Sequence, residues 1–315
     1  MTAPVFSQET LTACIRTHLT DSSTTPAFFP IPTGKFNTSY FVRLDGQEYV
    51  LRIAPPRDAV FVFYERDMMR QEPAIHDIIL RKTTVPVAKI LAFDDSQTAL
   101  PRDFLLMERL PGEPMSSSFA VNQNKVLRQV GEVLAQIHQL TAAQYGYLGE
   151  HAPMQPQPTW NDAFFIMWRK MLDDVTAVGY YSAEERDWLL KQLDTYAGVF
   201  ERQVAASLLH MDIWGQNILV DDAGSLSGLV DWDRALWGDP EIEFAVLDYC
   251  GISEPAFWEG YGQQRDHSNA AQIRSLFYLL YEMQKYIVIC HGRNNDPASA
   301  RQYKQQVLQL VRRYF

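Results

Sequence analysis

The pattern of hydrophobic and polar positions changes about a third of the way along the chain. Up to residue 109, short apolar runs of strand length dominate, and only residues 64–81 repeat their apolar side chains at helical spacing. From residue 110, where we expect a hinge, most apolar positions recur at helical intervals. The pattern predicts an α+β fold with a small sheet-rich lobe, residues 1–109, and a larger helical lobe, residues 110–315.

The sheet-rich part contains one clear hairpin signal. Residues 39–53 form two strand-like runs on either side of Asp45 and Gly46, a dipeptide typical of two-residue turns. Residues 87–93 and 104–107 are further apolar runs of strand length. These segments predict a small antiparallel sheet.

The helical part is interrupted once by strands. Residues 124–140 and 184–202 have the spacing of amphipathic helices. Between the second of these helices and the end of the chain, apolar runs at 217–220 and 226–230 flank a turn over residues 221–224. We therefore expect one short hairpin within the helical lobe.

Polar residues that could take part in catalysis or bind a metal gather around this short hairpin. The chain reads His210-x-Asp212-x4-Asn217, and Asp231 follows the second apolar run. Because a hairpin returns the chain to its starting edge, Asp212, Asn217 and Asp231 should lie together. Carboxylate and amide oxygens suit Mg²⁺, which keeps phosphate oxygens and water among its ligands. The spacing matches the phosphoryl-transfer template, in which the first Asp can accept a proton from a hydroxyl.

Other polar residues nearby have simpler interpretations. Asp233 should point away from Asp231 if the strand continues, and it is either structural or faces the substrate. Asp239 precedes a proline and is typical of a turn or a helix cap. His138 ends an apolar helical face and reads as a hydrogen-bonded core histidine.

Composition and charge narrow the class of partner. The chain has 315 residues, with 28 Lys and Arg against 38 Asp and Glu, so its formal net charge is −10. A broad basic surface for nucleic acid is therefore not expected, whereas a cationic small molecule would suit an acidic surface. Three cysteines, far apart in sequence, read as reduced thiols. The chain lacks a signal-peptide pattern and an 18-residue apolar run, so we expect a cytoplasmic protein that does not enter a membrane.

Several familiar motifs are missing from the sequence. It contains no GxxxxGK[ST], no HExxH and no GxSxG. These absences exclude a P-loop NTPase and argue against a zinc hydrolase and a serine hydrolase of the usual kind.

With its motifs in this order, the chain resembles the aminoglycoside phosphotransferase family over roughly residues 25–260. That family belongs to the protein-kinase-like superfamily, which also includes choline, fructosamine and methylthioribose kinases. The resemblance implies a bilobal kinase-like fold and Mg²⁺- and ATP-dependent phosphorylation of a hydroxyl on an aminoglycoside-like, sugar or amino-alcohol acceptor. It makes Asp212 the catalytic residue and Asn217 and Asp231 the metal ligands.

The resemblance also assigns the loop motif in more detail. By it, His210 holds the catalytic loop through hydrogen bonds and does not act as a base. Met211 departs from the family pattern, because a glycine commonly follows the histidine, so the loop geometry is expected to differ there.

In the small lobe the resemblance implies a triphosphate site. Residues 32–39 would cover the phosphates, with Gly34 and the Ser39 hydroxyl (or that of Thr38) contributing to the cradle. Arg52 occupies the position of the cation that grips the phosphates.

Arg52 needs an acidic partner in such a site. Glu72 lies on the apolar face of the helix predicted over residues 64–81, where a buried carboxylate requires a cation. Pro73 predicts a kink, or a helix that begins near this point. Glu65 is the alternative partner for Arg52.

The resemblance places adenine at the hinge. There the base would hydrogen-bond to the Glu108 carbonyl and the Leu110 N–H, and Leu51 and Ile218 are the candidate apolar walls.

The acceptor is expected between the catalytic loop and helices in residues 160–205 and 245–290. Aromatic and acidic side chains there would suit an amine-bearing or sugar acceptor. The candidates are Trp160, Asp162, Trp168, Asp173, Asp174, Tyr249, Glu254, Trp258, Tyr278 and Glu282.

Two other interpretations stay open at this point. One is a pseudokinase-like module that binds nucleotide without transfer. The other is a protein kinase, which is disfavoured because no Asp-Phe-Gly or Ala-Pro-Glu segment follows; Trp232 comes directly after Asp231.

Overall fold

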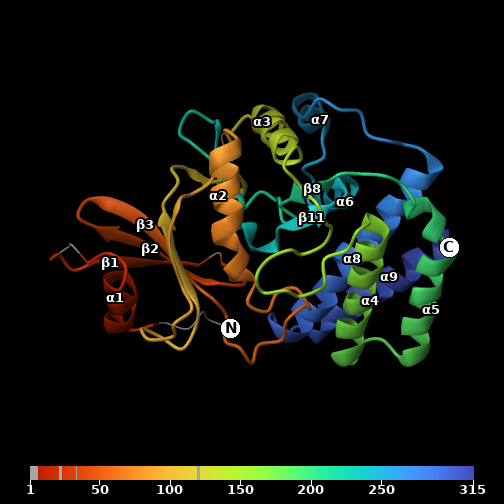
Figure 1. Ribbon diagram of the computed structural model, residues 1–315, viewed down its shortest axis with the longest axis horizontal. Helices are drawn as coiled ribbons and strands as arrows, with labels where there is room; N and C mark the ends of the chain where they lie inside the picture. The colour runs from red at the N-terminus through yellow and green to blue at the C-terminus, as the bar shows by residue number, and fades with distance from the viewer. Residues whose placement is uncertain (1–5, 21–22, 33, 119–120) are drawn as a thin grey trace.

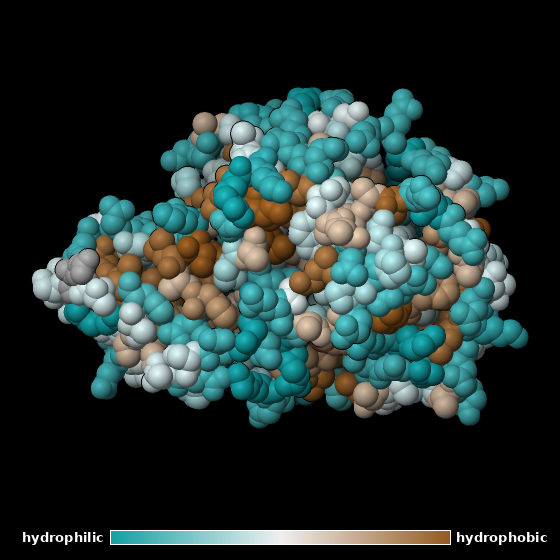
Figure 2. Space-filling model, viewed as in Figure 1, coloured by the Kyte–Doolittle hydropathy of each residue, from teal (hydrophilic) through white to brown (hydrophobic). Residues whose placement is uncertain are grey.

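The protein is described by a computed structural model that covers residues 6–20, 23–32, 34–118 and 121–315. A sheet-rich part lies at one end of the molecule and a helical part at the other (Figure 1). Figure 2 shows hydrophilic residues over most of this face, with apolar residues gathered around the sheet-rich end and near α2. The predicted α+β, kinase-like arrangement is confirmed.

The sheet-rich part contains one five-stranded antiparallel sheet in the order β1-β2-β3-β5-β4. Asp45 and Gly46 join β2 to β3 with φ of 51° and 76°, the left-handed pair that a tight hairpin turn requires, so the predicted hairpin is confirmed. A short helix, α1 (Gln8–Arg16), packs its apolar face on the sheet. The strands are β1 (Ala27–Ile31), β2 (Thr38–Leu44), β3 (Gln47–Ile53), β4 (Ile90–Asp94) and β5 (Phe104–Glu108).

The helix predicted over residues 64–81 begins later than its apolar spacing indicates. A 3₁₀ turn, Met68–Gln71, precedes α2, Glu72–Lys82. Pro73 lies in the first turn of α2, where its missing N–H costs nothing, so the helix starts there, as Pro73 predicted. In Figure 1, α2 stands between the sheet and the helical part.

Two three-stranded sheets support the motif residues. Their strand orders are β10-β9-β6 and β11-β8-β7. The predicted short hairpin is confirmed as β9 and β10, whereas β8, which leads into the loop that carries Asp212, was not predicted. The strands are β6 (Glu113–Pro114), β7 (Thr141–Ala142), β8 (Ala206–Leu209), β9 (Ile218–Val220), β10 (Leu226–Leu229) and β11 (Leu236–Gly238).

The helical part packs around α8, whose sides contact α4, α6 and α9. The two predicted amphipathic helices are present as α3 and α5, although α5 ends at Thr195 and a 3₁₀ turn, Ala197–Phe200, completes the predicted span. No helix within the described ranges has the length and apolar character needed to cross a membrane. The helices are α3 (Gln123–Ile137), α4 (Trp160–Ala177), α5 (Ala183–Thr195), α6 (Pro240–Tyr249), α7 (Pro255–Tyr261), α8 (Asn269–Gly292) and α9 (Pro297–Tyr314).

Candidate active site

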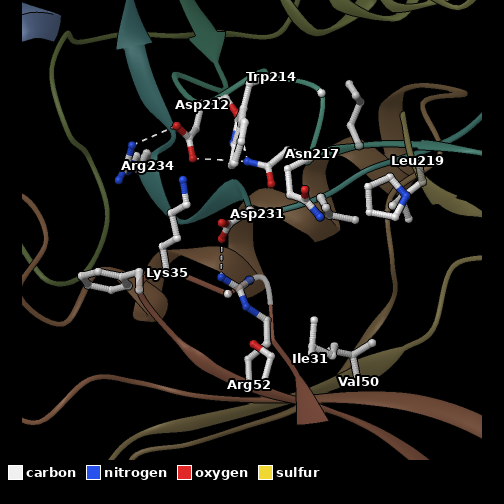
Figure 3. Close-up of a pocket in the computed structure, with 18 of the residues that line it drawn as sticks. Ile31, Lys35, Val50, Arg52, Asp212, Trp214, Asn217, Leu219, Asp231 and Arg234 are labelled. Carbon is white, nitrogen blue, oxygen red and sulfur yellow. Dashed lines mark hydrogen bonds and ion pairs between the residues drawn. The ribbon is translucent and has the colours of Figure 1, made fainter. Parts of the chain in front are cut away.

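A cavity of about 500 Å³ opens between the sheet-rich part and the helical part. One side is apolar and is formed by β-strand residues including Ile31, Val50 and Leu219 (Figure 3). Leu51 and Ile218, the predicted apolar walls, do not line the cavity; in each case an adjacent residue, Val50 or Leu219, does. Side chains alternate along a strand, so these two residues face the buried cores behind β3 and β9 while their neighbours face the cavity.

The loop before β2 forms the edge of the cavity. Gly34 and Ser39 both line it, as predicted, and Thr38 is buried. A Cβ atom on Gly34 would lie only 2.9 Å from the carbonyl oxygen of Asn37, so the loop closes tightly around a residue without a side chain. Thr33, in the same predicted loop, lies outside the described residues.

Arg52 reaches from β3 into the cavity and meets three carboxylates. It forms ion pairs with Glu72 of α2 and with Asp231, and its Nη2 lies 3.1 Å from Asp233 Oδ2. The predicted Arg52–Glu72 pair is therefore confirmed. Burial lowers the pKa of Arg52, but the three carboxylates outweigh it and raise that pKa above its usual value. The guanidinium stays charged.

Two of the carboxylates around Arg52, those of Glu72 and Asp233, have raised pKa values. Burial raises the pKa of Glu72 to about 7, against the opposing charge of Arg52. Burial and the neighbouring charge of Asp231 raise the pKa of Asp233 well above its usual range. The single positive charge of Arg52 does not neutralise three ionised carboxylates. A further proton or a bound cation would therefore stabilise the cluster.

Asp233 does not point away from Asp231, contrary to the prediction. The strand ends at Leu229, and Asp231 has a φ of 72°, in the left-handed region. A 3₁₀ turn then follows, so Asp233 returns to the cavity side, where Asn37 Nδ2 donates to it at 3.2 Å. The left-handed residue breaks the alternation on which the prediction rested.

Asp212 lies on the loop after β8 with both carboxylate oxygens engaged. Asn217 Nδ2 donates to Oδ2 at 3.2 Å, and Arg234 Nη1 donates to Oδ1 at 2.9 Å (Figure 3). Burial raises the pKa of Asp212, but the charges of Arg234 and Lys285 outweigh it and hold that pKa below its usual value. The carboxylate is ionised at neutral pH and has a fixed orientation.

The backbone before Asp212 shows why the family favours glycine at position 211 and what His210 does. Met211 has a φ of 65°, in the left-handed region where glycine is favoured, so the glycine common in the family suits this position. His210 accepts from the Asp212 N–H through Nδ1 at 3.2 Å and donates from Nε2 to the Val230 carbonyl at 3.0 Å. His210 therefore ties the loop to the segment between β10 and Asp231, as predicted.

His138 and Asp239 have the structural roles that were predicted for them. His138 is buried and lies 2.8 Å from both Tyr261 Oη and Glu243 Oε2. Asp239 caps the N-terminus of α6, where its side chain accepts from the Glu241 N–H. Glu243 also accepts from the Met211 N–H at 2.6 Å, so the core histidine indirectly supports the catalytic loop.

Asn217 and Asp231 offer oxygen ligands at the centre of the cavity. Both line it, and the Asp231 side chain is 33% exposed. Among the described residues, no cluster of three or more His, Cys, Asp or Glu side chains is arranged to hold a metal. The donor set fits Mg²⁺, which takes one or two protein ligands and completes its shell with phosphate oxygens and water.

The hinge residues lie where the nucleotide would enter. Glu108 and Leu110 both line the cavity beside the apolar side. The Glu108 N–H donates to the Lys89 carbonyl at 3.0 Å, which fixes the end of β5.

Glu65, the alternative partner for Arg52, lies elsewhere. Its fully buried carboxylate accepts from Arg293 Nη2 at 2.8 Å and from the Val62 N–H at 3.0 Å, and Arg234 lies 3.6 Å away. Glu65 thus joins two arginines on the side of the cavity near Asp212.

Few of the predicted acceptor residues line the cavity. Of the ten aromatic and acidic candidates, Tyr249 alone lines the cavity that the described residues form. Trp160, Trp168 and Tyr278 are core residues, and Glu282 is a buried partner of Lys285. The sequence analysis missed the following lining residues: Lys35, Trp214, Arg234, Tyr286, Arg293 and Asn294.

Comparison with known proteins places this fold. The chain is 24% identical over 291 residues to a probable ketoamine kinase of Enterococcus faecium, covering 86% of this chain and 94% of the relative. A structure assigned as a fructosamine-3-kinase from Haemophilus somnus superposes with a TM-score of 0.68 at 17% identity, over 96% of both chains. Aminoglycoside phosphotransferase APH(4)-Ia, in complex with AMP-PNP and hygromycin B, gives 0.67 at 17% identity, over 96% and 98%. The chain therefore has the kinase-like fold of small-molecule phosphotransferases.

A family model identifies the chain more closely. The model of the phosphotransferase enzyme family matches residues 29–276, which is most of the chain. The chain belongs to this family, and it is a kinase of small molecules.

Proposed function

We propose that this protein transfers the γ-phosphate of ATP to a hydroxyl of a sugar-derived small molecule and requires Mg²⁺. The observation that carries the proposal is the convergence of Arg52, Asp212, Asn217 and Asp231 on one cavity. The ketoamine kinase relatives support a sugar-derived acceptor among the aminoglycoside, sugar and amino-alcohol classes. No observation favours a pseudokinase-like module, because the base, both metal ligands and the Arg52–Glu72 pair are present.

In this proposal residues 1–109 bind the nucleotide and residues 110–315 supply the base and the acceptor site. Adenine lies between Val50 and Leu219 and bonds to the backbone of Glu108 and Leu110. The loop that contains Gly34 and Ser39 covers the phosphates.

Arg52 and the metal ligands bind the triphosphate. Asn217 and Asp231 would hold Mg²⁺, which supplies positive charge against the phosphate oxygens when it is bound. Arg52 keeps Glu72 and Asp233 as partners while Asp231 is engaged, so its position does not depend on Asp231 alone.

Asp212 receives the proton. The acceptor oxygen forms a bond to the γ-phosphorus, the bond from that phosphorus to the β,γ-bridging oxygen breaks, and ADP leaves. The acceptor's hydroxyl proton passes to a carboxylate oxygen of Asp212. Asn217 and Arg234 hold that carboxylate in a fixed direction, which lowers the cost of reaching the reactive geometry.

The test is ADP release from ATP and Mg²⁺ across a panel of ketoamines, sugars and amino alcohols. We expect acceptor-dependent ADP release and a phosphorylated product by mass spectrometry, both lost in Asp231→Ala. Arg128→Gln, a change of one charge on an exposed surface ion pair, is the matched control and should keep the wild-type rate. ADP release that is independent of every acceptor would contradict the proposal.

A further inference from the structure

Three basic side chains gather in the part of the cavity near Asp212, away from the apolar adenine side. Lys35, Arg234 and Arg293 line the cavity there, and the acidic side chains of Asp212 and Asp231 line the same cavity. In Figure 3 the Lys35 side chain rises into the cavity toward Asp212 and Arg234. The chain as a whole has a net charge of −10, so this acceptor side has the opposite sign from the protein that surrounds it.

The arginines on the acceptor side have unequal freedom. Arg234 is committed to Asp212 at 2.9 Å and lies 3.6 Å from Glu65. Arg293 donates to Glu65 through Nη2 at 2.8 Å, and this is its one side-chain hydrogen bond among the described residues. Its side chain is 16% exposed, so the guanidinium keeps N–H donors for a ligand in the cavity.

The aromatic walls here already hold cations. Lys35 Nζ lies 4.8 Å from the centre of the Trp214 ring, and the Arg293 guanidinium lies 4.5 Å from that of Phe36. One face of each of these two rings is thus occupied by a charge of the protein itself. A polycationic acceptor would meet three positive side chains and would have to displace these contacts.

We propose that the acceptor carries a carboxylate, which Arg293 binds while the reacting hydroxyl lies at Asp212. The acceptor is then a sugar derivative that has both a hydroxyl and a carboxylate, and not a polyamine antibiotic. Arginine suits this role because its planar fork matches a carboxylate. This inference rests on the proposed function, which makes the cavity the site where the acceptor binds.

The test compares two ligands that differ in one charge. Binding of fructosylglycine and of fructosylglycinamide is measured by calorimetry with ADP and Mg²⁺ present. We expect the carboxylate form to bind at least about tenfold more tightly to the wild type, because the amide cannot accept the charge-assisted hydrogen bonds that the Arg293 guanidinium offers to a carboxylate. In Arg293→Gln the two affinities should become equal within about twofold.

Matched variants separate this role from folding. Arg293→Lys keeps the charge and should retain part of the preference, and Arg128→Gln removes a remote surface charge and should retain all of it. Thermal melting of each variant checks that the fold persists. Equal or tighter binding of the amide, binding of neither ligand, or a preference that survives Arg293→Gln would each overturn the proposal.

The two proposals fail differently. Charge-selective binding without ADP release would refute the phosphoryl transfer and leave the carboxylate site. Phosphorylation of both ligands at equal efficiency would refute the carboxylate site and leave the transfer.

Discussion

The two ends of the cavity carry opposite charge. Around Arg52, one cation faces Glu72, Asp231 and Asp233, so the ionised cluster has an excess of negative charge. Around Asp212, the cations Lys35, Arg234 and Arg293 outnumber the acids Asp212 and Glu65. Each end therefore lacks the charge that its proposed ligand brings, a divalent cation at one end and an anionic acceptor at the other.

The strongest way to break this contrast is to remove the cation from the acidic end. Arg52→Met should lower the free energy of unfolding by about 3–5 kcal/mol, because it leaves three carboxylates together in a largely buried site. Urea denaturation without nucleotide measures the loss. Adding Mg²⁺ or lowering the pH should recover part of it, and a variant as stable as the wild type at pH 8 would contradict an excess of negative charge.

At the acceptor end the largest effect should be on turnover. Asp212→Asn keeps the shape of the side chain and its Asn217 contact but removes the proton acceptor, so kcat should fall on the order of 10²-fold or more. Steady-state ADP release measures it. A wild-type kcat in this variant would remove Asp212 from the role of base, while unchanged ADP affinity is the expected control.

Glu72 at one end of the cavity and Asp212 at the other should affect the pH dependence of stability in opposite ways. The pKa of Glu72 is raised to about 7, so the folded state holds a proton that the unfolded state releases at lower pH. Stability should therefore fall as the pH rises from about 4.5 to 7, by about 1–3 kcal/mol. The pKa of Asp212 is lowered, so that group favours the fold throughout this range and loses its contribution only in stronger acid.

Glu72→Gln is the variant that checks this dependence. It removes one titrating group and should make the curve of unfolding free energy against pH less steep, measured in urea at pH 5, 6 and 7; the raised pKa values of Asp174, Asp233 and Asp239 keep the remaining slope. If the wild type and the variant have the same slope, Glu72 is not the group responsible.

The smallest expected effect is that of Lys35→Ala, which tests whether Lys35 acts on the acceptor or on the triphosphate. Lys35 is exposed, so Lys35→Ala should reduce the preference for fructosylglycine over its amide by only about two- to threefold. ADP affinity should stay within twofold of the wild type in the same calorimetry. A weaker ADP affinity with an unchanged acceptor preference would place Lys35 with the triphosphate.

The motif residues and Glu72 could be predicted from the sequence because they follow local rules. Asp212, Asn217 and Asp231 are brought together by one short hairpin, and Glu72 was placed by helical spacing. Errors arose where a local rule fails. Leu51 and Ile218 lie in strands that are apolar on both faces, so alternation did not show which face meets the cavity. Asp233 was misplaced because nothing marked Asp231 as left-handed.

The acceptor end could not be predicted in the same way. Arg293 follows α8 and meets Glu65, which lies 228 residues earlier in the chain. No spacing rule links such positions, since only the packing of α8 against the rest of the helical part brings them together. Aromatic and acidic residues that looked suitable in sequence lie instead in the core or, like Asp162, in the first turn of a helix.

The left-handed Met211 has a consequence for how this enzyme could be altered. A residue with a side chain costs about 1–2 kcal/mol in that conformation, and here the methionine side chain is buried in the core and so anchors the loop. Glycine would relieve the strain and remove the anchor together. Position 211 therefore sets how stiffly the loop that carries Asp212 is held, and a change there would alter the rigidity of the site without altering any residue that lines it.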